Sequence, residues 1–93
     1  MQINAAIQLL PLGAKGSRYE VVDKAIVLIQ KSGLNYKVCP FETVVEGQPD
    51  AVYKLIRDIQ DTMISEDCTE ILINIKIHAA NRNLSFSEKL EKY

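Results

Sequence analysis

Few residues of this chain belong to the types that commonly carry out covalent chemistry. His78 is its only histidine, and Cys39 and Cys68 are its only cysteines. A general base needs an orienting partner and a nucleophile or acidic proton within reach, and no Ser-His-Asp or Cys-His order is recognisable. Metal sites need clusters of ligands, and one histidine among scattered carboxylates does not form one. We therefore predict no catalytic, metal or cofactor site and interpret His78 as a polar-face or interface residue.

The two cysteines could in principle form a disulfide or bind a metal, and one glycine-rich segment could bind phosphate. Cys39 and Cys68 form no CxxC pair, so we expect free thiols in a reducing cytoplasm.

Residues 13–17, Gly-Ala-Lys-Gly-Ser, lack the spacing of a phosphate-binding Walker loop. We predict that this segment is a turn into a helix, with Ser17 and Glu20 at the spacing of a capping box. An anion at the helix N-terminus is the alternative.

Thr43 and Glu46 are candidates for ligand binding, because a hydroxyl and a carboxylate stand at the end of a probable strand, just before a helix that starts at Pro49. They lie three positions apart, so on a regular strand they point to opposite faces. They can serve one pocket only if the strand is bulged or ends near Val45. Alternatively, Thr43 is simply a β-branched strand residue and Glu46 is stabilised by the helix dipole.

Length and composition favour a single globular domain spanning residues 1–93. Hydrophobic residues make up 47% of the chain and charged residues 25%, which is ordinary for a small domain with a modest core. The formal net charge of −1, without a basic cluster, argues against nucleic-acid binding. The N-terminus lacks the features of a secretory leader, and no apolar run is long enough to span a membrane. We expect a cytoplasmic protein.

Hydrophobic periodicity predicts six main elements and a short C-terminal helix. Ile3, Ala5, Ile7 and Leu9 alternate with Gln2, Asn4, Ala6 and Gln8, which predicts a strand. Helical spacing follows in Val22, Ala25, Ile26 and Ile29 and again in Val52, Leu55, Ile56, Ile59 and Met63. The remaining predictions are strands at 36–39, 42–46 and 71–78. A short C-terminal helix is also predicted, because Ser85 and Glu88 have the spacing of a capping box.

The order β-α-β-β-α-β is typical of the ferredoxin-like α+β fold, in which two helices cover one face of a four-stranded antiparallel sheet. The first and last strands should be neighbours, so their polar sides form a continuous patch on the uncovered face. Its predicted members are Gln2, Asn4, Ala6, Gln8, Leu72, Asn74, Lys76 and His78. This amide-rich face could mate subunits, bind a flat polar ligand or simply be solvated.

The succession of short motifs resembles the small thiamine-binding protein family, also known as the MTH1187-type or YkoF-like family. The resemblance rests on Pro11-Leu12-Gly13, then Ser32-Gly33-Leu34-Asn35-Tyr36, then the block from Thr43 to Gly47, and a final isoleucine-rich strand. There are two departures. Glu42 stands where the family commonly has glycine. The last strand ends with Ile75-Lys76-Ile77-His78, and the acidic pair that usually follows this strand in the family is missing.

The resemblance implies a non-catalytic protein that binds thiamine or its hydroxymethylpyrimidine moiety and assembles into dimers or tetramers. It implies ligand contacts from Thr43 and Glu46, with Asn4 and Gln8 as secondary candidates. Two rivals stay open. A small ferredoxin-like enzyme of the isomerase or monooxygenase type would use His78 as its acid-base group. A regulatory or assembly module would use the amide-rich face only to join subunits.

Overall fold

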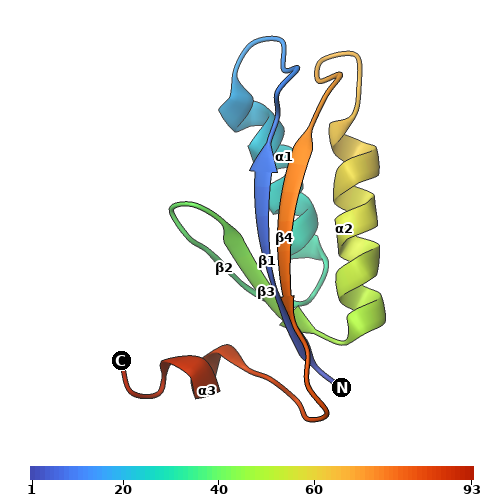
Figure 1. Cartoon of the computed structure of the whole chain (residues 1–93). Coiled ribbons are helices and arrows are strands. Elements are labelled where there is room, and N and C mark those ends of the chain that lie inside the picture. Colours follow the sequence, from blue (N-terminus) through green and yellow to red (C-terminus); the bar gives the residue numbers. More distant parts are fainter.

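The computed structural model describes all residues, 1–93, and has the predicted ferredoxin-like architecture (Figure 1). The elements are β1 (Ile3–Leu10), α1 (Arg18–Lys31), β2 (Asn35–Val38), β3 (Thr43–Gly47), α2 (Pro49–Met63), β4 (Leu72–His78) and α3 (Phe86–Leu90). The four strands form one antiparallel sheet in the order β2-β3-β1-β4. Strand β1 is therefore central, and β2 and β4 are the edges.

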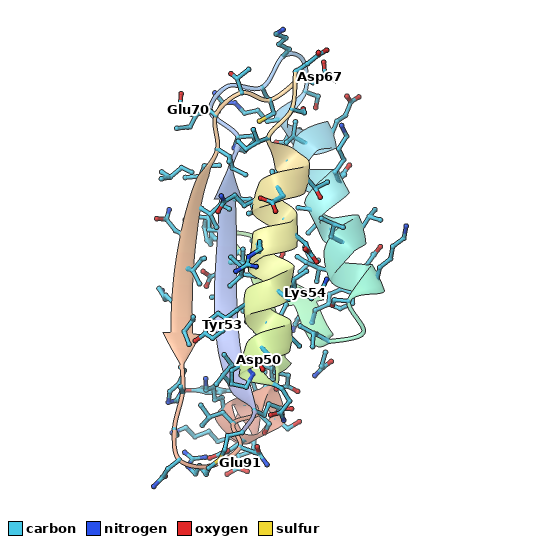
Figure 2. The ribbon with its side chains drawn as sticks, turned by 90° about the vertical axis from the view of Figure 1, so that its right-hand side faces the viewer. Asp50, Tyr53, Lys54, Asp67, Glu70 and Glu91 are labelled. Atoms are coloured by element: carbon cyan, nitrogen blue, oxygen red, sulfur yellow. The ribbon has the colours of Figure 1, made fainter.

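The two long helices cover one face of this sheet, and Figure 2 shows them on the same side of β1 and β4. The core lies between the layers. Its members from the helices and strands are Ile3, Ala5, Ile7, Val45, Val21, Ala25, Ile29, Val52, Leu55, Ile59 and Met63. The predicted α2 stripe is confirmed, with Ile56 half-buried beside it. In α1, Val21 is fully buried where the helical spacing pointed to Val22, which is half-buried.

Three glycines explain why the short sequence motifs have their form. Gly33 has a φ of +78° just after α1, a conformation that residues with a Cβ rarely adopt. A Cβ on Gly47 would lie 2.6 Å from Leu34 Cδ2, and a Cβ on Gly13 would lie 2.8 Å from the backbone nitrogen of Glu70. Gly13 also exchanges backbone hydrogen bonds with the segment before β4. These motif residues therefore shape tight turns and close packing.

Some predicted details differ from the structure. Ser17 is the N-cap of α1, but its side chain makes no capping hydrogen bond. Strand β2 begins one residue earlier than predicted, and Gly47 is the last residue of β3, paired with Ile3, instead of lying beyond it. Strand alternation predicts that Ile75 and Ile77 lie on the helix-covered side of β4, opposite the polar patch, and the structure places them there, but they are 38% and 42% exposed. Their edge position puts them beyond the reach of the helices.

Candidate functional site

The face of the sheet opposite the helices carries two complete rows of side chains. In an antiparallel sheet, directly paired residues point to the same face. The first row crosses all four strands through Asn35, Glu46, Asn4 and His78. The second row, two residues along, contains Lys37, Val44, Ala6 and Lys76. Amide and charged groups thus lie beside small apolar residues in the middle of the sheet.

The C-terminal segment lies against one end of this open face. Leu84 is 1% exposed, its backbone nitrogen donates to the Gln2 carbonyl at 3.1 Å, and its carbonyl accepts from the Gln2 side chain. Phe86 N donates to Glu46 Oε2 at 2.7 Å. The first residues of the tail therefore pack within the chain, against β1 and β3. Helix α3 itself, capped as predicted by Ser85 Oγ accepting from Glu88 N at 3.1 Å, has no fully buried residue.

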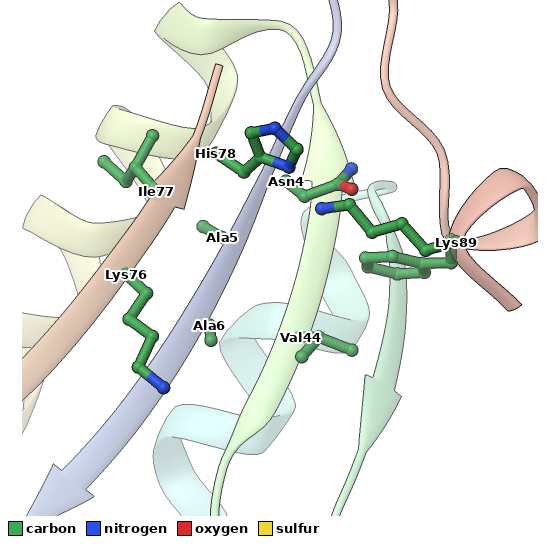
Figure 3. A pocket seen from close by; sticks show the side chains of 9 residues that line it. Asn4, Ala5, Ala6, Val44, Lys76, Ile77, His78 and Lys89 are labelled. Atoms are coloured by element: carbon green, nitrogen blue, oxygen red, sulfur yellow. The ribbon is translucent and has the colours of Figure 1, made fainter. Parts of the chain in front are cut away.

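The open face and α3 together enclose a groove of about 610 Å³. Its lining is formed by Asn4, Ala5, Ala6, Val44, Lys76, Ile77, His78, Phe86 and Lys89. Ala6 and Val44 form an apolar floor, while β4 and α3 provide the two sides. Figure 3 shows Lys76 and Lys89 projecting into this space from those two sides, with His78 and Asn4 at one end. This volume is within the range typical of small-molecule sites.

Asn4 is the most unusual residue of the groove. It is only 5% exposed, and its Nδ2 donates to the Leu84 carbonyl at 3.5 Å. That contact assigns the Oδ1 atom to the other side of the amide, where it is buried and has no hydrogen-bond partner. Leaving a buried acceptor unpaired costs about 1–3 kcal/mol. A ligand with an N–H donor would recover this free energy by pairing with Oδ1.

The electrostatic character of the groove is positive. Its charged lining residues are Lys76 and Lys89, with His78 beside them, and no carboxylate lines it. The nearest row of the sheet contains Glu46, but both of its carboxylate oxygens are occupied. Glu46 Oε1 accepts from Asn35 Nδ2 at 2.6 Å, and Oε2 accepts from Phe86 N. Glu46 therefore holds the C-terminal segment against the sheet.

The other predicted ligand residues lie elsewhere. Thr43 pairs with Ile7 on β1 and Val38 on β2, so it faces the helices, and it is 6% exposed. The pairing of β1 with β3 is continuous, without the bulge needed to bring Thr43 and Glu46 to one face. Gln8 is on the open face but accepts a hydrogen bond from Asn74 Nδ2 at 3.2 Å, outside the groove lining. Of the four candidates, only Asn4 lines the groove.

Thr43 instead borders a smaller cavity of about 270 Å³ between α1 and the β2–β3 turn. That cavity also has two carboxylates, Asp23 and Glu42, and two largely exposed aromatic rings, Tyr19 and Phe41. It is a second place where a cationic ligand could bind. The structure thus separates the four predicted residues between two faces of the sheet.

Sequence reasoning missed the contribution of the tail. Phe86 and Lys89 line the groove, and neither was a candidate. The capping spacing of Ser85 and Glu88 predicted their helix but could not predict where it packs. Cys39 and Cys68 are free thiols, and no group of three or more His, Cys, Asp or Glu side chains is placed to hold a metal ion. No helix has both the length and the apolar composition needed to cross a membrane.

Comparison with known proteins gives a consistent family. Residues 5–93 match the model of a family described as thiamine-binding protein. A UPF0045 protein of Clostridium perfringens is 32% identical over 90 residues, covering 97% of this chain and 95% of that protein. The structure of a DUF77 domain of unknown function from Bacillus cereus is 33% identical with a TM-score of 0.92, covering 100% of this chain and 90% of that one.

A second similar structure comes from Thermotoga maritima and belongs to a candidate thiamine biosynthesis/salvage protein. It has a TM-score of 0.90 at 24% identity and covers 100% of this chain and 99% of that one. At this identity the similarity demonstrates the shared fold alone. The predicted resemblance is confirmed by the family match and by the first two relatives.

Proposed function

Because the chain belongs to the thiamine-binding protein family, we propose that it binds thiamine or its hydroxymethylpyrimidine moiety in the open-face groove without catalysing a reaction. The observation that carries the proposal is the buried, unpaired Oδ1 of Asn4 beside a groove of suitable size. An aminopyrimidine is flat and carries an exocyclic amino group. It can lie on Ala6 and Val44 while that amino group donates to Oδ1.

Access to Oδ1 requires movement of one side chain. Figure 3 shows Lys89 extending from α3 toward the Asn4 amide. Lys89 is exposed and makes no salt bridge, and its flexible four-carbon stem lets the ammonium group move aside at small cost. Phe86, which also lines the groove, then offers an aromatic side for the ring.

Titration calorimetry with thiamine and with hydroxymethylpyrimidine tests this proposal. Asn4→Leu removes the unpaired acceptor and keeps a side chain of similar size, so affinity should fall about tenfold. The free energy of unfolding should change little, because the Leu84 carbonyl that loses Asn4 Nδ2 still accepts from the Gln2 side chain. Gln8→Leu is the matched control on the same strand and face, and it should leave affinity unchanged. Absence of binding by the unmodified protein would contradict the proposed function. An unchanged affinity of Asn4→Leu would place the ligand outside this groove.

We also propose that the functional unit is a homo-oligomer, a dimer or a tetramer, that is joined through the β4 edge. Strand β4 pairs only with β1, so its outer backbone groups are free to pair with a second copy. Ile75 and Ile77 are partly exposed along the same edge and would be covered by that pairing.

Light scattering tests the assembly. The chain mass is 10.5 kDa, and the unmodified protein should give a multiple of it at micromolar concentration. Ile77→Lys should shift the mass toward the monomer, whereas Val27→Lys, at a similarly exposed position on α1, should not. A stable monomer of the unmodified protein contradicts the proposal, and equal effects of the two variants contradict the choice of the β4 edge.

A further inference from the structure

The positive charge of the groove has a consequence for the chemical form of its ligand. Lys76 and Lys89 come from different elements and enter the groove from opposite sides (Figure 3). Thiamine carries a cationic thiazolium ring, and hydroxymethylpyrimidine is neutral. Two ammonium groups repel the first and gain no ionic contact from the second. Neither ligand uses the charge that the groove presents.

We propose that the groove is selective for a phosphorylated aminopyrimidine, in which the pyrimidine amino group pairs with Asn4 Oδ1 and the phosphate lies between Lys76 and Lys89. This inference rests on the proposed function and names the ligand form that suits the same site. A phosphate monoester carries about −1.5 to −2 charges at neutral pH and has three acceptor oxygens. Two lysine side chains and the N–H of His78 supply donors for such a group.

The sheet register supports this placement. Lys76 pairs with Ala6, and His78 pairs with Asn4, so both side chains stand on the open face two residues apart on β4. Two residues of a strand span about 6.6 Å, a distance that a flexible lysine stem bridges to meet a phosphate beside the imidazole. The unpaired amide oxygen is in the same row as His78. One ligand can therefore donate a hydrogen bond to Asn4 Oδ1 and also place an anionic group beside Lys76 and His78.

The nearest carboxylates make contacts with other protein groups and do not pair with the groove lysines. Glu46 uses both oxygens for Asn35 and Phe86. Glu88, on the same helix as Lys89, is held by Arg82 at 2.6 Å and 2.9 Å. Neither lysine of the groove has an ion-pair partner, while Lys54 on α2 is paired with Asp58. The groove lysines are thus free to bind an incoming anion.

The test compares hydroxymethylpyrimidine with its monophosphate by titration calorimetry of the full chain, with thiamine as a third ligand. Hydroxymethylpyrimidine monophosphate should bind the unmodified protein about tenfold more tightly than hydroxymethylpyrimidine at low salt, since one charge-assisted contact contributes that much. The preference should shrink as salt is raised, because the lysines are solvent-exposed. Inorganic phosphate alone should bind weakly, because it lacks the group that pairs with Asn4.

Three variants locate the effect. Lys76→Gln and Lys89→Gln should each reduce the preference for the phosphorylated form several-fold while leaving the affinity for unphosphorylated hydroxymethylpyrimidine nearly unchanged. Lys24→Gln removes the same charge from an exposed position on α1 and should retain the full preference, which separates local contact from net charge.

The outcomes distinguish this inference from the proposed function. Equal binding of phosphorylated and unphosphorylated forms overturns the inference and leaves the proposed function intact. Failure to bind hydroxymethylpyrimidine, its monophosphate and thiamine alike overturns both. A preference that survives both groove-lysine substitutions, or that Lys24→Gln abolishes equally, overturns the assignment of the phosphate to Lys76 and Lys89.

Discussion

The two faces of the sheet differ in what their side chains have as partners. On the helix-covered face, Ala5, Ile7 and Val45 are at most 3% exposed and pack within the core. On the open face, Ala6 and Val44 are half-buried, and the neighbouring Asn4 holds an unpaired acceptor. On the helix-covered face the apolar side chains are already buried, so a ligand would gain no further contact there. The open face leaves both apolar area and a polar atom that binding would satisfy.

Within one strand, the residues on the helix-covered face contribute to stability, and the alternate residues on the open face are available for binding. Because side chains alternate between faces, neighbouring residues of β1 and β3 serve different purposes. Burial by α1 and α2 stabilises the fold, and the uncovered residues can vary in polarity without loss of the core. The tail covers only one end of the open face, and this partial cover creates a groove from what would otherwise be a flat surface.

The largest expected effect comes from Val45 and Val44, two valines next to each other on β3. Val45 is 0% exposed, so Val45→Ala should lower the free energy of unfolding by about 2–3 kcal/mol, through lost burial and a residual cavity. Val44→Ala should cost less than about 1 kcal/mol, because Val44 faces the groove. Urea unfolding measures both values. Equal losses would show that the two faces contribute alike to stability.

Removal of residues 85–93 tests the open face next. The deletion keeps Leu84 and its hydrogen bonds to Gln2 but removes Phe86 and Lys89 from the groove. Affinity for hydroxymethylpyrimidine should fall by up to about tenfold, since an aromatic contact contributes about 0.5–1.5 kcal/mol. Strand content by circular dichroism should persist, because the core lies on the other face. Unchanged affinity would exclude the tail from the site.

The fold was largely predictable from periodicity, and the elements that bear the core show why. Alternation in β1 and the apolar stripe of α2 are local signals that tertiary packing reinforces. The errors arose where packing decides the outcome. Whether Val21 or Val22 is the more deeply buried depends on the rotation of α1 against the sheet, and the exposure of Ile75 and Ile77 depends on the edge position of β4.

The groove was only partly predictable. Asn4 was found because strand alternation assigns it to the open face. The spacing of Thr43 and Glu46 already indicated opposite faces, and the unbulged strand has that geometry. The contribution of Lys89 depends on a tail that crosses back over the sheet, a contact between distant segments that no local pattern encodes. Ligand contact by Thr43 stays a prediction, now at the separate cavity beneath α1.

Glu46→Gln is a subtler probe of the open face. The change keeps the shape but replaces one carboxylate oxygen with an amide nitrogen, which weakens the contacts with Asn35 and Phe86. The binding free energy should weaken by about 0.5–1.5 kcal/mol, equally for thiamine and hydroxymethylpyrimidine, because Glu46 acts by holding the tail against the sheet. Calorimetry with both ligands measures the ratio. A larger loss for thiamine would mean that the carboxylate offsets the thiazolium charge directly.

The smallest effect is expected for Thr43→Val, which removes a hydroxyl and keeps the β-branched shape. Thr43 is buried on the helix-covered face, away from the groove. If the ligand binds on the open face, its affinity should change by less than about 0.5 kcal/mol, since no contact is lost. If the ligand instead occupies the cavity that Thr43 shares with Asp23 and Glu42, the loss should reach about 0.5–1.5 kcal/mol. Cationic thiamine should then also lose affinity in Glu42→Gln, whereas Asn4→Leu should have no effect. The Thr43→Val and Asn4→Leu titrations together therefore decide which face of the sheet binds the ligand.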